Sequence, residues 1–453
     1  MPVSISVVIP THNRAASLRR TLDALATQTY PLEAVEVLVV ADGCCDETVA
    51  MLQEYSAPFA LRVLEQAGQG PAMARNHGAV HATGQLLLFL DDDIEAAPGL
   101  IEAHVHAHLS RTGQVVLGYL PPVVHGEAGL FPGELRAWWE TMFDAMRRTG
   151  HRYTYCDLLS GNFSVEGTLF AHVGGFDASF RCHEDYEFGA RLLSAGTEFT
   201  FNADALGYHH EMTDLDRALR RKYEEGIADV QLGRRHPQLR PTLLLTRLET
   251  FFSPPSRILR TLAFEHPVAG DTLIAQFQRC LDFLERARLR RLWRLMLDGL
   301  LGYWYWRGVA EALGTRQAFA EFLADISKGD EESDIPELDL LDGLEAVEQR
   351  LDEERPAGAR IRYGRKVVGR IPPQSGAERL RGVHLRPILR RELAVPLLKA
   401  LVFEPGVGES AAADHLLEVL FERKWYYRIL RNRSRFAAGG AGVSWRRSGY
   451  SGR

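Results

Sequence analysis

Short apolar runs alternate with stretches of helical periodicity at the beginning of the chain. The apolar runs are rich in valine, isoleucine and leucine and close on polar residues, as β-strands do, whereas the stretches between them repeat leucine or alanine with a helical period. In chain order, the predicted strands cover residues 5–10, 35–40, 61–64 and 86–90, and the predicted helices cover residues 18–25, 48–55 and 72–81. Strands that alternate with helices predict an α/β fold with a Rossmann-like, mostly parallel central sheet.

The fourth predicted strand ends in three consecutive carboxylates. Residues 86–90 are apolar throughout, which is typical of a strand covered on both faces, and Asp91, Asp92 and Asp93 follow directly. Ligands of open parallel sheets bind beyond the carboxyl ends of the strands. Three adjacent carboxylates repel one another, so a divalent cation or a cluster of donors is expected beside them. The alternative is a solvated acidic turn, and we rank it second.

Three further polar clusters follow predicted strands or precede predicted helices. They cover residues 11–14, 42–46 and 68–75. In one parallel sheet these ends converge on the same crevice as the aspartates. Asp42 can accept a hydrogen bond from a base or sugar, Arg75 can pair with a phosphate, and the aspartates can hold a metal that bridges phosphates. The clusters together predict a site for a nucleoside diphosphate.

An acidic pair opens a later predicted helix. Glu184 and Asp185 stand at the start of a helical pattern over residues 183–193. Acidic residues are common at helix N-termini, where they cap the helix and complement its dipole. A carboxylate at the edge of a cleft can also serve as a general base. The two residues by themselves favour neither interpretation over the other.

The remainder of the chain reads as mainly helical, then mixed. We expect helices over residues 217–326, an acidic linker near 327–340 and a hairpin over residues 360–371. The predicted organisation is a first domain over 1–235, a mostly α-helical region over 236–330, a small α+β extension over 331–435 and a disordered tail over 436–453. The aromatic helix at 286–307 suits a membrane surface or a protein core, and we favour the core.

Charge and cysteine usage narrow the functional classes. The formal net charge of −6 gives no global positive field, so we expect no nucleic-acid partner. The five cysteines are an odd set without zinc or disulfide spacing, which predicts free thiols in a reducing compartment. Neither a signal peptide nor a transmembrane stretch is expected. We therefore expect a cytoplasmic location, with peripheral contact at the inner face of the membrane left open.

A series of motifs in a fixed order resembles a known enzyme family. The motifs are Val8 to Asn13, Val39 to Asp46, Gly70 to Gly78, Phe89 to Asp93, Gly161 to Ser164, Gly174 to Asp177, Glu184 to Asp185 and Tyr208 to His210. Each is weak alone, but their order over the first half of the chain resembles the inverting family 2 glycosyltransferases of GT-A fold, in a bacterial form with a C-terminal extension.

The resemblance implies roles for individual positions. In such enzymes Asp185 would be the catalytic base and Asp93 the metal ligand of an Asp-x-Asp motif, while Asp91 would hold the ribose. His209 would complete the metal or diphosphate site, although the adjacent His210 competes for that role. The other donor-binding positions implied are Pro10, Thr11, Asn13, Asp42, Arg75 and Asp92. Acceptor contacts are expected at Glu184 and Asn162, the latter with a plain turn as its alternative.

The expected activity is metal-dependent inverting transfer, with Mn²⁺ or Mg²⁺, of a sugar from a nucleotide-sugar donor, a UDP-sugar by preference. The acceptor would be a hydroxyl of a glycan, a lipid-linked or a small molecule. One alternative is a nucleotidyltransferase, which residues 11–14 match poorly because such enzymes carry a glycine-rich phosphate loop near the N-terminus. Another is an inactive sugar-nucleotide scaffold, against which the intact Asp93 and Asp185 argue. The sequence carries no readable signal for the sugar, the acceptor or the oligomeric state.

Overall fold

The computed structural model describes residues 2–125, 129–250, 254–324 and 335–403, together with the short pieces 415–416 and 419–420. The chain forms two compact units. The first comprises Met1–Asp334 and Pro373–Arg379, and the second comprises Ile335–Pro372 and Leu380–Arg453. The helical region expected over 236–330 therefore belongs to the same unit as the sheet. The expected tail over 436–453 lies outside the described residues.

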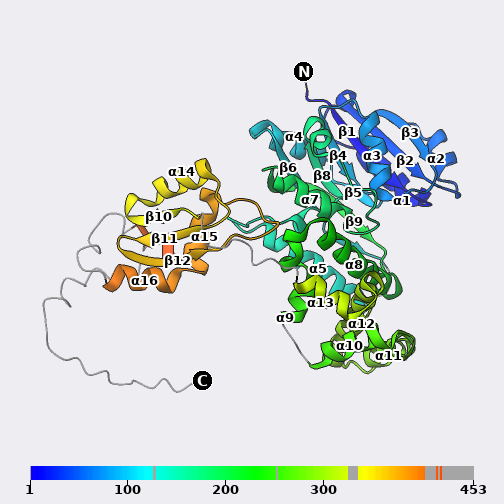
Figure 1. Cartoon of the computed structure of the whole chain (residues 1–453). Coiled ribbons are helices and arrows are strands. Elements are labelled where there is room, and N and C mark those ends of the chain that lie inside the picture. The colour runs from blue at the N-terminus through cyan, green and yellow to red at the C-terminus, as the bar shows by residue number, and fades with distance from the viewer. Residues whose placement is uncertain are drawn as a thin grey trace, which may run out of the picture. The chain divides into compact units, whose positions relative to one another are not determined.

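A mixed β-sheet is the centre of the first unit (Figure 1). Its strands are β1 (Ile5–Thr11), β2 (Val35–Asp42), β3 (Ala60–Gln66), β4 (Leu86–Leu90), β5 (Ile94–Ala96), β6 (Gln114–Tyr119), β7 (Pro122–Val124), β8 (Asn162–Glu166) and β9 (Glu198–Glu211). The order is β3-β2-β1-β4-β8-β6-β9-β5, and β7 pairs with β9. The neighbouring strands from β3 to β4 are parallel, and β8 runs antiparallel between β4 and β6. The predicted α/β class with its parallel βα units is confirmed.

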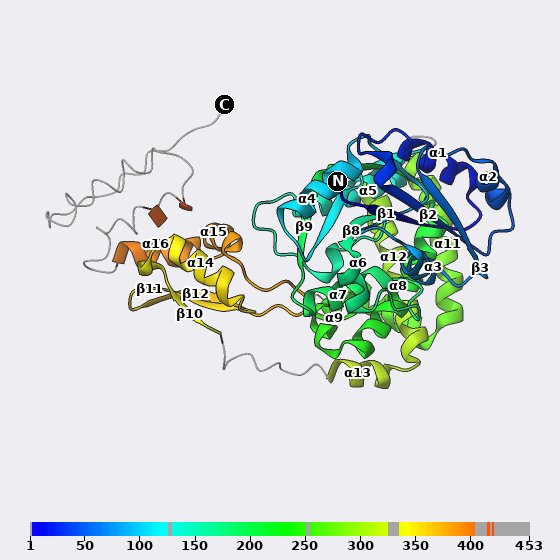
Figure 2. The ribbon, with the colours of Figure 1, turned by 90° about the horizontal axis from the view of Figure 1, so that it is seen from above.

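The apolar runs become strands because both faces of the sheet are covered. All five residues of β4 are buried, and β1 is buried at six of its seven positions. The helices of this part are α1 (Ala15–Leu25), α2 (Thr48–Glu54), α3 (Pro71–His81), α4 (Leu100–Ser110), α5 (Leu130–Met146), α6 (Gly167–Val173) and α7 (Glu184–Ser194). Figure 2 shows α3 beside β1 and β2 and α4 beside β9, pairs that are in contact. The polar strand ends consequently face one edge of a closed core.

The helical region packs tightly through two glycines. It contains α8 (Leu215–Arg235), α9 (Leu244–Thr250), α10 (Pro254–Glu265), α11 (Pro267–Arg286), α12 (Arg290–Leu313) and α13 (Arg316–Ala324). A Cβ on Gly308 of α12 would lie 1.9 Å from the Tyr223 carbonyl oxygen of α8, and one on Gly226 would lie 2.2 Å from that of Tyr305. Only glycine permits this close approach of two helix backbones.

Four of the five aromatic residues of α12 lie in the core, and Trp304 is partly buried. Trp293, Tyr303, Tyr305 and Trp306 are each at most 2% exposed. The interpretation of this segment as a core helix, which we favoured over a membrane-surface helix, is confirmed for these side chains. Among the described residues, no helix is both long enough and apolar enough to cross a membrane.

One later segment belongs to the first unit although it interrupts the second. Within Pro373–Arg379, Gly376 accepts a hydrogen bond from the backbone N–H of Tyr155, and the Glu378 N–H donates to the Tyr153 carbonyl. Tyr155 begins the short 3₁₀ helix Tyr155–Asp157, which packs against α7. The segment thus supports the elements beneath α7.

The second unit has its own small core. It contains β10 (Glu337–Asp339), β11 (Ala359–Tyr363), β12 (Lys366–Ile371), α14 (Leu344–Glu354), α15 (Gly382–Arg391) and α16 (Ala394–Phe403). The hairpin expected over residues 360–371 is present as antiparallel β11 and β12, turning at Gly364 with a φ of +62°. Beyond residue 403, the described residues of this unit are only 415–416 and 419–420.

Candidate active site

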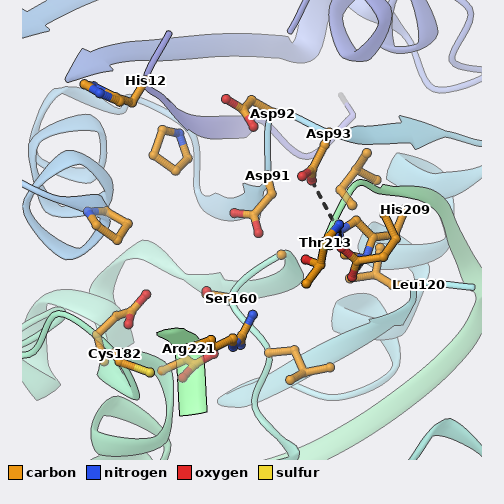
Figure 3. Close-up of a pocket in the computed structure, with 18 of the residues that line it drawn as sticks. His12, Asp91, Asp92, Asp93, Leu120, Ser160, Cys182, His209, Thr213 and Arg221 are labelled. Carbon is orange, nitrogen blue, oxygen red and sulfur yellow. Dashed lines mark hydrogen bonds and ion pairs between the residues drawn. The ribbon is translucent and has the colours of Figure 1, made fainter. Parts of the chain in front are cut away.

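A cavity of about 670 Å³ opens at the carboxyl ends of β1, β2 and β4. Its lining comes from these strand ends, from the start of α7, from the end of β9 and from the first turns of α8. Figure 3 shows Asp91, Asp92 and Asp93 on one side of this space, with Cys182 and Arg221 on the other. The expected crevice beyond the strand ends is therefore present, and segments more than a hundred residues apart share it.

Asp92 is the buried member of the three aspartates. Its carboxylate accepts hydrogen bonds from the Thr11 hydroxyl at 2.7 Å and the Arg14 guanidinium at 2.8 Å. Burial and the neighbouring Asp93 raise the pKa of Asp92 to about 6, against the lowering effect of Arg14. Asp92 therefore ties the loop after β1 to the end of β4, and its partners are protein side chains.

Asp93 faces His209 because of the strand register. Antiparallel pairing of β5 with β9 sets Ile94 opposite His209, and the His210 N–H donates to the Asp93 carbonyl. The His209 Nε2 consequently lies 3.6 Å from Asp93 Oδ1, while Arg14 donates to Asp93 Oδ2 at 2.7 Å. Burial raises the pKa of Asp93, but His209 and Arg14 outweigh it and lower that pKa to about 2.

The two adjacent histidines point to opposite faces of β9, as neighbours on a strand do. His210 is hydrogen-bonded to Glu95 at 2.8 Å and to His125 at 2.6 Å. It does not line the cavity, whereas His209 does. Of the two, His209 is the one placed beside Asp93.

The donor set beside Asp93 suits a divalent cation that takes part of its coordination from a ligand. Asp93 Oδ1 is buried and has no hydrogen-bond partner, and the same is true of Nδ1 of His209. No cluster of three or more histidine, cysteine or acidic side chains placed to hold a metal occurs in the part of the chain that the structure describes. Mg²⁺ is commonly held by one or two carboxylates together with substrate phosphates and water. Asp93 and His209 fit that kind of site.

Asp42 organises the loop before α3. Its two carboxylate oxygens accept hydrogen bonds from the backbone N–H groups of Gln69 and Gly70, each at 2.7 Å, and from the Gln66 side chain at 2.9 Å. Asp42 also lines the cavity, as Pro10 and Thr11 do. Asn13 does not, because its side-chain oxygen accepts from the N–H groups of Cys45 and Asp46.

Arg75 joins the two halves of the site. Its buried guanidinium donates to Asp91 at 2.7 Å and to Glu184 at 2.9 Å, across 109 residues of sequence. Burial and the adjacent Asp185 raise the pKa of Glu184, although Arg75 opposes them. Arg75 and Glu184 therefore both bind protein side chains. The phosphate contact expected for Arg75 and the acceptor contact expected for Glu184 stay predictions.

Asp185 stands in the first turn of α7 and lines the cavity. One of its carboxylate oxygens accepts from the Tyr186 N–H at 2.9 Å. His183, just before it, has a left-handed backbone with a φ of 61° and forms an ion pair of 3.2 Å with Asp229 of α8. Tyr305 of α12 donates to the same Asp229. The helical region therefore holds the segment that presents Asp185.

Asn162 lies away from the cavity, in a buried chain of hydrogen bonds. Its amide donates to the Ala205 carbonyl at 2.9 Å, and its oxygen is 2.9 Å from Nε2 of His104. Ser164 lies 2.8 Å from Nδ1 of His104 and 2.9 Å from Nε2 of His108. When each group donates one hydrogen bond, the series is consistent: His108 donates to Ser164, Ser164 donates to His104, and His104 donates to Asn162. Because the Asn162 side chain is buried and does not line the cavity, the expected acceptor contact at this position is not included in the proposed site.

Comparison with known proteins agrees with this geometry. Residues 6–162 match the family described as Glycosyl transferase family 2. The validoxylamine A glucosyltransferase of Streptomyces hygroscopicus subsp. jinggangensis is 31% identical over 322 residues, covering 62% of this chain and 72% of that protein. The chain belongs to glycosyltransferase family 2. The pre-mycofactocin glycosyltransferase of Mycobacterium tuberculosis is 27% identical, over 53% of this chain and 50% of that protein.

Among solved structures, a mannosyltransferase from Pyrobaculum calidifontis in complex with GDP-Man and Mn²⁺ matches with a TM-score of 0.48 and 18% identity. The match covers 69% of this chain and 88% of that one. The family membership and the sheet described above confirm the expected GT-A architecture and the expected class of enzyme, a glycosyltransferase. The five cysteines of this family 2 glycosyltransferase are all free thiols, as predicted.

Several residues of the site escaped the sequence analysis. They are Arg14, His12, Trp138, Trp139, Glu211 and the arginines at 181, 217, 220 and 221, all of which line the cavity. Arg14 carried a usable signal, because it closes the polar cluster after the first strand. His12 lies in the same cluster, whereas the others stand in helices, loops or the end of β9, whose approach to the aspartates depends on the tertiary fold.

Proposed function

We propose that this glycosyltransferase transfers a sugar from a UDP-sugar to an acceptor hydroxyl with inversion, using Asp185 as general base and a divalent cation at Asp93. The donor would occupy the end of the cavity formed by β1, β2 and β4. The acceptor would enter from the side of α7 and α8.

The observation that carries the proposal is the shared cavity of Asp185 and the three aspartates after β4. Buried Arg75 fixes this relation, because it is ion-paired on one side to Asp91 and on the other to Glu184, the neighbour of Asp185. A single displacement requires a base on one side of the sugar and a leaving diphosphate on the other. The site supplies carboxylates at both positions.

The chain's own residues can perform the proton transfer and hold the donor. Asp185 would take the proton from the acceptor hydroxyl as that oxygen attacks the anomeric carbon. Thr11 and Asp42, which line the donor end, would position the nucleotide, and the loop that Asp42 orders would close over it. His183 and its partner Asp229 would keep Asp185 aimed at the acceptor.

Asp93 and His209 would hold Mn²⁺ or Mg²⁺; the supporting observation is that the buried Oδ1 of Asp93 makes no hydrogen bond and lies 3.6 Å from Nε2 of His209. When bound, such an ion stabilises the negative charge of the leaving diphosphate as a Lewis acid. Arg14 already donates to the other oxygen of Asp93, so it would keep the carboxylate oriented toward His209.

The membership of family 2 favours glycosyl transfer over the nucleotidyl transfer that we also considered. The free thiols support the proposed cytoplasmic location, where disulfides are rare.

A panel of nucleotide sugars tests the proposal. We expect at least one UDP-sugar to raise the melting temperature of the purified enzyme with Mn²⁺, because a ligand that binds the folded state stabilises it. EDTA should reduce that shift, and Asp93→Asn should reproduce the reduction without EDTA. Transfer or donor hydrolysis is then measured with the same sugar. A shift that is identical with Mn²⁺, with EDTA and in the variant would remove the metal from the proposal.

A further inference from the structure

The arginines of the cavity form two groups. Arg14 and Arg75 lie at the donor end and are neutralised by the carboxylates described above. Arg181, Arg217 and Arg220 also line the cavity, but in the part of the chain that the structure describes their guanidinium groups have no hydrogen bond or ion pair to protein. The second group therefore has charge and donors available for a ligand.

Three arginines of α8 share one face of the helix. Arg220 and Arg221 follow Arg217 by three and four residues, which places them on the same side of the helix as Arg217. All three line the cavity from the first two turns of α8. Arg221 approaches Glu225 only at 3.5 Å, whereas Lys222 lies 2.5 Å from the same carboxylate. The Arg221 side chain is 63% exposed. Glu225 thus leaves most of the Arg221 guanidinium free.

This arginine face lies beside the proposed base. Arg221 is close enough to Asp185 and Tyr186 to interact with them electrostatically. Arg181 precedes Asp185 by four residues in the sequence. Figure 3 shows Arg221 across the cavity from the aspartates that follow β4. The group that a general base touches is the acceptor hydroxyl, so the arginines face the acceptor's side of the cavity.

Unpaired cations in one cavity repel one another, and an anion between them removes the repulsion. Guanidinium groups bind phosphate through paired, charge-assisted hydrogen bonds, and clusters of arginine are a recurrent phosphate site. The lining of the same cavity also includes Trp138 and Met212, which are 50% and 65% exposed. Such a surface can pack against a sugar or an alkyl chain next to the phosphate.

We infer that the acceptor of this glycosyltransferase carries a phosphate group, which Arg217, Arg220 and Arg221 bind while Asp185 contacts the acceptor hydroxyl. The inference rests on the proposed function and names the acceptor class of the same site. The phosphate can belong to a soluble sugar phosphate or to a phospholipid headgroup, since both present the same oxygens to the arginines.

Binding to the full-length enzyme, saturated with UDP and Mn²⁺, tests the inference. The soluble arm compares glucose 6-phosphate with glucose by calorimetry. The lipid arm compares vesicles of phosphatidylcholine with and without phosphatidate by co-sedimentation. The variants are Arg217→Gln, Arg220→Gln and their combination, and Arg291→Gln is the matched control, because Arg291 is an exposed arginine of α12 that does not line the cavity. UDP affinity is measured separately for each protein.

We expect one phosphate-bearing probe to bind at least about tenfold more tightly than its partner probe, and each variant to lose about tenfold of that affinity. The control should keep it, and all proteins should bind UDP equally. The responding arm identifies the source of the phosphate. No phosphate preference in either arm, or an equal loss in the control, overturns the inference. So does weaker UDP binding in the combined variant, since it would place the arginines at the donor. Wild-type enzyme that does not bind UDP contradicts the proposed function instead, and the arms repeated without UDP still test the arginines.

Discussion

The buried histidine of α4 gives a pH dependence that the structure makes quantitative. His104 is fully buried, and burial lowers its pKa from 6.5 to about 4, although the hydrogen bond to Asn162 opposes the shift. The folded protein therefore keeps this ring neutral where the unfolded chain already binds a proton. The stability that His104 contributes is complete above pH 6.5 and is lost as the pH falls toward 4.

The size of the effect follows from the shift. A difference of about 2.5 pKa units corresponds to about 3 kcal/mol once the pH is below both values, and to about 2 kcal/mol at pH 5. The replacement His104→Gln removes the titrating group. It also weakens the hydrogen-bond chain at every pH, so the informative quantity is how the difference between wild type and variant changes with pH.

Urea unfolding followed by tryptophan fluorescence measures this difference, since most of the seven tryptophans lie in the first unit. Wild type should exceed His104→Gln in unfolding free energy at pH 8, and the excess should shrink by about 2 kcal/mol at pH 5. His106→Gln is the control, because the His106 side chain lies on the same helix and is 67% exposed. An excess of the same size at both pH values would refute the reasoning.

Four further substitutions test the packing of the first unit. Arg75→Met leaves two carboxylates without their buried partner, so we expect a loss of about 3–5 kcal/mol in chemical unfolding, together with weaker UDP binding. Gly376→Ala should destabilise the first unit in thermal unfolding, because φ is +70° there and a Cβ would lie 2.5 Å from the Tyr155 ring; wild-type stability would exclude that strain. Gly308→Ala should also destabilise, whereas Gly299→Ala on the same helix, with open space around it, should gain up to about 1 kcal/mol; equal effects would argue against the close helix contact.

Local patterns predicted well which strand-end residues would line the cavity. The run that became β4 is buried at every position, and the strand-end rule placed the aspartates in a cavity. The same logic placed Thr11 and Asp42 there. These predictions succeed because short stretches of sequence suffice to indicate a buried strand and the end at which it stops.

The remaining parts of the site depend on contacts between residues far apart in the sequence, which no local pattern predicts. The ion pair of Arg75 with Glu184 spans 109 residues, and the strand β9, which brings His209 to Asp93, mixes polar and apolar residues without a clear period. The motif around Asn162 suggests a ligand-binding residue, yet the amide oxygen of Asn162 lies within hydrogen-bond distance of His104 on α4. Partners of this kind follow from tertiary packing, which decides which polar groups meet.

The proposal that Asp185 is the general base is tested most directly by Asp185→Asn. With the UDP-sugar identified in the panel, the account predicts that the initial rate of transfer falls by at least about a hundredfold, because the amide cannot take the acceptor proton, while the dissociation constant for UDP stays the same. Transfer at the wild-type rate in this variant would contradict the account.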